Sequence, residues 1–156
     1  MRTKNYFKSW SVGLFTLLLL GSGAISNAQT VTIGTTSGIG TTTSYPCPIQ
    51  DFYYGTRVQF LYTASELAAV GITSGATINE IGWIVQATTI AGHLQEGYSI
   101  SLLNTAVSTL DLNSWEAGAS LVYGPVNYSY TSGYAGNVMF TTSPFTYAGG
   151  NLIVEV

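Results

Sequence analysis

Apolar and polar residues alternate in several short runs along the second half of the chain. The apolar positions of these runs are Ile81, Trp83, Val85, Tyr98, Ile100, Leu102, Val126, Tyr128, Tyr130, Val138, Phe140, Leu152, Val154 and Val156. Successive side chains of a strand point to opposite faces, so this period of two predicts strands with one buried face. Gly, Pro and Asn separate the runs, which is typical of antiparallel sheets. We therefore predict an all-β chain folded as an antiparallel, jelly-roll-like β-sandwich, because stacking two sheets buries both apolar faces.

One short helix is predicted within this pattern, near residues 64–70. Residues 57–62 have the pattern of a strand, and the segment TASEL follows them. Thr63 followed three residues later by Glu66 has the spacing of a capping box, in which each residue bonds to the backbone of the other. Ala and Leu favour the helical conformation, and Gly71 is suited to end the helix.

The N-terminus has the layout of an export signal. Arg2, Lys4 and Lys8 are followed by an apolar run over 12–20 and by Ser-Asn-Ala at 26–28. The apolar run is shorter than the ~20 residues that a membrane-spanning helix needs, so we predict a signal peptide of residues 1–28 that is cleaved after Ala28. The remaining module, 29–156, is expected to be extracellular or on the cell surface, without membrane insertion.

Charge is scarce and mostly negative. The chain has four Lys and Arg residues against seven Asp and Glu residues, and three of the four basic residues lie in the predicted signal. The module keeps only Arg57 against all seven acids, which gives it a formal charge of −6. One cation cannot neutralise a row of phosphates, so nucleic acid is excluded as a partner. Anionic membrane surfaces are excluded for the same reason.

The sequence offers no set of groups for catalysis. His93, the only histidine, lies in a predicted hairpin tip, and no metalloprotease, nucleophile-elbow or CxxC motif is present. The acidic residues are scattered, and Glu80 and Glu155 fall on the polar faces of predicted strands, where an acid is usually solvated. We expect no enzymatic activity, no catalytic residues and no cofactor.

Two groups of residues are candidates for binding. Asp111, Asn113 and Glu116 place three oxygen-bearing side chains in one loop, which suits a structural calcium ion; the alternative is an Asx turn. Tyr and Trp side chains exposed on a β-sandwich can stack on sugar rings, whereas the alternative is cross-strand packing. The candidates for glycan contact are Tyr53, Tyr54, Trp115 and Tyr134.

The C-terminal strand and the single cysteine raise a question of completeness. The apolar alternation of residues 152–156 is still running at Val156, which predicts a module truncated in its last strand; the alternative is a strand that simply ends the sheet. Cys47 lies between Pro46 and Pro48 in an extended edge segment. It is either a buried free thiol, an intermolecular partner or half of a disulfide.

Three stretches together resemble a known family. They are PCPIQDFYYGTRVQFLYTASELAAVGITSGATINEIGWIV, VYGPVNYSY and FTTSPFTYAGGNLIVEV. They resemble an N-terminal module of large secreted proteins of Bacteroidota, and the resemblance covers nearly all of 31–156. In that family the module often precedes fibronectin-III-like repeats and a C-terminal type IX sorting domain. The resemblance implies compartment and architecture more than an activity.

The resemblance also bears on Cys47. In that family a cysteine commonly follows the last strand at once, so the resemblance implies that Cys47 pairs with a cysteine outside the present chain, beyond Val156. Such a bond would close a loop on the order of a hundred residues and would contribute a few kcal/mol on the chain-entropy model. Only one half of the bridge is in this sequence.

These observations lead to one expected function and two alternatives. We expect a non-catalytic adhesion or binding module of a larger extracellular protein, with extracellular protein or glycan and the downstream domains of its own polypeptide as partners. One alternative is an accessory, glycan-binding domain of a secreted hydrolase. The other is a self-assembling surface protein, in which the incomplete final strand would leave an open sheet edge for another chain.

Overall fold

The computed structural model describes residues 28–34, 47–49, 55–85, 94–131 and 133–156. Except for residues 28–30, the described part belongs to a compact unit that spans Val31–Val156. The predicted signal peptide lies outside the described residues, apart from Ala28. Within the described part, no helix has the length and the apolar character of a membrane span.

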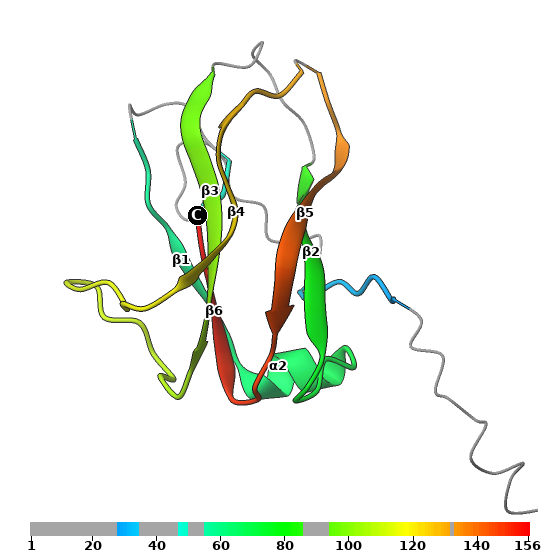
Figure 1. Cartoon of the computed structure of the whole chain (residues 1–156), viewed down its shortest axis with the longest axis vertical. Coiled ribbons are helices and arrows are strands. Elements are labelled where there is room, and N and C mark those ends of the chain that lie inside the picture. The colour runs from blue at the N-terminus through cyan, green and yellow to red at the C-terminus, as the bar shows by residue number, and fades with distance from the viewer. Residues whose placement is uncertain (1–27, 35–46, 50–54, 86–93, 132) are drawn as a thin grey trace, which may run out of the picture. The chain divides into compact units, whose positions relative to one another are not determined.

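The described strands form two antiparallel sheets (Figure 1). The elements in chain order are β1 Gln59–Tyr62, α2 Ala64–Ala69, β2 Thr77–Val85, β3 Gln95–Thr105, β4 Ser120–Tyr128, β5 Gly136–Thr146 and β6 Asn151–Glu155. The larger sheet has the strand order β1-β6-β3-β4, and β2 pairs with β5 in the smaller one. The prediction of an all-β antiparallel sandwich is confirmed.

The core lies between the two sheets and is rich in aromatic rings. Phe140 of β5 packs against Tyr98 of β3 and Tyr123 of β4, with ring centroids 5.2 and 5.0 Å apart, and against Trp83 of β2 at 5.7 Å. Such edge-on and tilted pairs contribute about 0.5–1.5 kcal/mol each beyond the burial of their area. The predicted buried face of β3, formed by Tyr98, Ile100 and Leu102, is confirmed.

The predicted helix and its cap are also confirmed. The Glu66 backbone N–H donates to Thr63 Oγ1 at 3.3 Å, and the Thr63 N–H donates to Glu66 Oε2 at 2.8 Å. Leu67 is buried in the core between the sheets. Asn151 of β6 accepts a further hydrogen bond from the Ala64 N–H at 2.8 Å, so the start of α2 is tied to the larger sheet.

The predicted face of the fourth strand is partly wrong. β4 starts at Ser120, and its fully buried residue is Val122, whereas Val126 is 39% exposed. β4 is the edge strand of its sheet and has a hydrogen-bonded neighbour on one side only. The β3–β4 register also shifts between Tyr98 and Ile100, which changes the side-chain alternation along β4.

The final strand is not at an edge, which corrects the prediction of an open edge there. β6 lies between β1 and β3, with Glu155 opposite Gln59 on one side and Ser101 on the other. Its backbone groups are therefore hydrogen-bonded on both sides. β6 does not offer the open edge through which self-assembly was predicted to occur.

The outer face of β6 is covered as well: Ile153 lies on the face opposite to Leu152 and Val154 and is 0% exposed. The prediction of a single buried face is therefore wrong for this strand. Residues 106–119, between β3 and β4, loop out on the side of the larger sheet away from β2 and β5 (Figure 1). This segment is fixed to the sheet by Asn151, whose Nδ2 donates to the Val107 carbonyl at 2.8 Å, and again by Gln59 at Glu116. The two anchors lie on either side of Ile153 along the strands.

Candidate ligand-contact site

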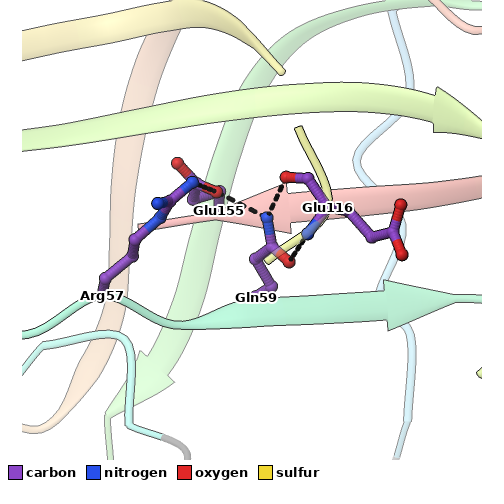
Figure 2. A network of polar contacts seen from close by, with 4 residues as sticks. All are labelled: Arg57, Gln59, Glu116 and Glu155. Carbon is purple, nitrogen blue, oxygen red and sulfur yellow. Dashed lines mark hydrogen bonds and ion pairs between the residues drawn. The ribbon is translucent and has the colours of Figure 1, made fainter. Parts of the chain in front are cut away.

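The candidate site lies on the outer face of the larger sheet. Gln59 and Glu155 are direct partners in the β1–β6 ladder, so their side chains lie on the same face. Arg57 precedes Gln59 by two residues and also reaches Glu155. Figure 2 shows these three side chains converging beside Glu116 of the 106–119 segment.

The amide of Gln59 holds this segment to the sheet. Its Nε2 donates to the Glu116 carbonyl at 2.8 Å, and its Oε1 accepts from the Glu116 N–H at 3.0 Å. The side chain therefore pairs with one backbone residue as a peptide group of a neighbouring strand would. Nε2 also donates to Glu155 Oε2 at 2.6 Å. Because its polar atoms have these partners, burying the Gln59 amide costs little in desolvation. The same hydrogen bonds fix the backbone of Glu116 and therefore the position of the residue before it.

That neighbouring residue is Trp115. The guanidinium carbon of Arg57 lies 4.9 Å from the centre of the Trp115 ring, and Arg57 Nη2 lies 2.7 Å from Glu155 Oε2. A cation over an exposed ring contributes about 0.5–1 kcal/mol, and an exposed ion pair contributes about as little. The effect of these contacts is therefore mainly to hold the indole in one orientation.

Trp115 stays open to solvent in this position. Its side chain is 52% exposed, although the neighbouring Gln59 is buried. Leu121 of β4 is also exposed. It lies opposite Ser101 of β3, and Ser101 lies opposite Glu155 of β6, so Leu121 is on the same face of the larger sheet as Glu155 and Gln59. Planar polar side chains beside an oriented, exposed indole form a surface that can stack on an apolar ring face and bond to the groups at its rim.

The calcium candidates form a turn. Asp111 Oδ1 accepts from the Asn113 N–H at 2.8 Å and from Asn113 Nδ2 at 3.3 Å, which is the Asx turn considered as the alternative. These hydrogen bonds, the backbone one first, lower the pKa of Asp111. Glu116 is held by its backbone, and its carboxylate points away from Gln59 (Figure 2). No group of three or more His, Cys, Asp or Glu able to hold a metal occurs among the described residues; calcium binding stays a prediction.

Of the other glycan-contact candidates, Tyr134 lies in the described part of the chain, and it is bonded to the smaller sheet. Tyr134 is exposed, but its hydroxyl donates to the Asn137 carbonyl of β5 at 2.6 Å, so it belongs to the smaller sheet. Tyr53 and Tyr54 lie outside the described residues, as does His93.

Cys47 is half-buried and is a free thiol in the structure. Its Sγ donates to the Ile49 carbonyl at 3.0 Å. Burial raises its pKa, and the hydrogen bond to the Ile49 backbone opposes that change in part. The disulfide to a cysteine outside the chain stays a prediction.

Sequence reasoning found Trp115 but missed the residues that orient it. Glu155 was expected to be a solvated acid, whereas its side chain is only 17% exposed and is bonded to Arg57 and Gln59. The available signal was the uniqueness of Arg57 in the module: a lone cation among seven acids is apt to be paired.

Comparison with protein-family models, with curated proteins and with solved structures gives no match. The functional argument therefore rests on the residues of this chain.

Proposed function

We propose that the chain is a non-catalytic binding module of a larger secreted or cell-surface protein, and that it contacts glycan through Trp115. The observation that carries the proposal is an indole that is half exposed yet held by Arg57, which comes from another segment of the chain. An oriented aromatic ring loses little conformational freedom when a ligand binds, so such a ring is suited to stack on a sugar.

The geometry suggests how a sugar would bind. The apolar face of a pyranose ring would stack on the part of the indole that Arg57 leaves open. Hydroxyl groups at the rim of the sugar would meet the exposed part of the Arg57 side chain, which is 48% exposed. No described residue is needed as an acid or a base, so the proposal is one of adhesion without chemistry.

The predicted export signal supports the extracellular part of this proposal, because glycans of cell walls and matrices are found there. The accessory domain of a secreted hydrolase would use the same surface to keep its enzyme on a polysaccharide. A catalytic motif in the downstream part of the polypeptide would distinguish that role from adhesion alone.

The test is affinity electrophoresis of the protein through gels that contain soluble polysaccharides, some neutral (mixed-linkage β-glucan, mannan, dextran) and some acidic (homogalacturonan, alginate). We expect at least one of them to retard the protein, and the Trp115→Ala variant to lose about tenfold in affinity, the equivalent of one aromatic contact. Leu112→Ala is the matched control, because Leu112 lies on the same segment and is fully exposed. Unchanged mobility in every gel, or equal retardation of wild type and Trp115→Ala, would refute the proposal; circular dichroism checks that the variants are folded.

A further inference from the structure

The charges around Trp115 limit which glycans the site can take. Arg57 is the only cation of the predicted module, and its guanidinium is already engaged by Glu155 at 2.7 Å and by the Trp115 ring. An arginine beside an aromatic ring would ordinarily suggest a site for a carboxylated or sulfated sugar, since guanidinium binds such groups in a forked geometry. Here the anion in that position is supplied by the protein itself.

The other charged residues of the segment that carries Trp115 are negative. Asp111 and Glu116 belong to the same segment as Trp115, and Glu155 is the partner of Arg57 in the adjacent strand. Of these three carboxylates, Glu155 makes the contact with Arg57, while Asp111 and Glu116 add negative charge to the segment that carries Trp115. Hydrogen bonds keep Asp111 ionised by lowering its pKa. The module as a whole carries −6. An approaching polyanion meets repulsion from the site and from the whole module.

We propose that the Trp115 surface selects neutral polysaccharide and discriminates against polysaccharide that carries carboxylate or sulfate groups. This inference rests on the proposed function, and it names the class of glycan for that site. The discrimination comes from Glu155, which occupies the one guanidinium, and from the net negative charge of the 106–119 segment and of the module as a whole. The stacking surface itself is indifferent to charge at the rim of the sugar.

The test uses two matched pairs of oligosaccharides, in which the acidic member carries carboxylate groups that the neutral member lacks. One pair is cellohexaose and its C6-oxidised glucuronate hexamer; the other is methyl-esterified and free oligogalacturonate. Affinities are measured by titration calorimetry in about 50 mM and about 500 mM NaCl. We expect the neutral member to bind about tenfold more tightly than the acidic member at low salt, with the gap closing at high salt because screening acts only on the charged ligand.

Glu155→Gln tests the cause. It removes the paired carboxylate and keeps groups that can bond to Gln59 and Arg57, so the fold is expected to survive. The ratio of neutral to acidic affinity should therefore fall several-fold in this variant. Glu80→Gln is the control, because Glu80 is an exposed acid on the smaller sheet and its loss changes the net charge equally.

Each outcome decides between the two proposals. Tighter, Trp115-dependent binding of the acidic members by the wild type would overturn the selectivity and leave the glycan-binding function standing. Equal responses of Glu155→Gln and Glu80→Gln would show that net charge, not the engaged Arg57, sets the preference, and would overturn the role assigned to Glu155. Should no member of either pair bind through Trp115, the inference fails together with binding to these sugars. The gel panel then tells whether the proposed function fails as well. If Glu155→Gln does not fold, the salt dependence of the wild type still tests the selectivity.

Discussion

Two glutamines show that the contribution of a buried amide to stability depends on whether its hydrogen bonds are made. Gln59 has both ends of its amide bonded, to the Glu116 backbone and to Glu155. Gln95, at the start of β3, has an Nε2 that is buried without a partner in the described part of the chain. A buried polar group stabilises only when its hydrogen bonds are made, and an unmade bond costs about 1–3 kcal/mol.

We therefore expect opposite results from the same substitution at the two positions. Gln59→Leu should lower the free energy of unfolding by about 1–3 kcal/mol, because the N–H and the carbonyl of Glu116 lose their partners. Gln95→Leu should leave it unchanged within about 0.5 kcal/mol or raise it. Urea unfolding followed by circular dichroism measures both. Equal losses in the two variants would mean that the Gln59 amide does not hold the segment.

At the scale of elements, local signals predicted what is local. Thr63 and Glu66 predicted the helix and its cap, and alternation predicted the inner face of β3. The same reasoning missed the first half of β4, because Gly124-Pro125 in the middle of a strand has the composition of a turn. Proline is tolerated there since β4 is an edge strand and loses no hydrogen bond on its free side.

Gly124 itself is required by the contact between β3 and β4. A Cβ atom at this position would lie 2.2 Å from the Tyr98 carbonyl oxygen, and φ is +77°. Gly118 has a similar φ of +91° but open space around it. We expect Gly118→Ala to cost about 1–2 kcal/mol from backbone strain alone. Gly124→Ala should cost clearly more, because the strands must also separate. Thermal unfolding compares the two variants, and equal melting temperatures would contradict the close approach.

At the scale of the whole molecule, the strand order could not be read from the sequence. Alternation shows that a segment is a strand but not which strands are its neighbours, and β6 was therefore placed wrongly at an edge. The ligand-contact site shows the same limit. The sequence shows Trp115 as an aromatic residue in a loop. Arg57 and Gln59 come from the segment containing β1, and Glu155 comes from β6, so these residues meet only after the sheet has formed.

The buried tyrosines make the fold sensitive to alkaline pH. Burial raises the pKa of Tyr98 far above the ordinary value near 10, with smaller contributions from Tyr128, Tyr123 and Cys47, and burial also raises the pKa of Tyr62. Above pH 10 the unfolded chain releases these protons while the folded chain retains them. The free energy of unfolding must therefore fall as pH rises.

The measurement is the urea midpoint at pH 8, 10 and 11. We expect it to be steady up to about pH 9 and to fall beyond pH 10. Tyr98→Phe should reduce that fall, and it should not lower stability at pH 8, because the Tyr98 hydroxyl is buried without a hydrogen-bond partner among the described residues. A wild type and a Tyr98→Phe variant with the same alkaline profile would show that Tyr98 is not the group responsible.

The place of β6 between β1 and β3 has a consequence for how the protein is made. β1 pairs with β6, and the paired residues Gln59 and Glu155 are 96 positions apart in the sequence. Within the described chain, β1 has no other hydrogen-bonded neighbour. A ribosome delivers the chain from its N-terminus, so the larger sheet cannot close while residues 151–155 are still unsynthesised. Contacts between such distant residues also form slowly. The segment that becomes β1 therefore stays without its ladder partner until β6 has been synthesised, although β3 can already pair with β4 and β2 with β5.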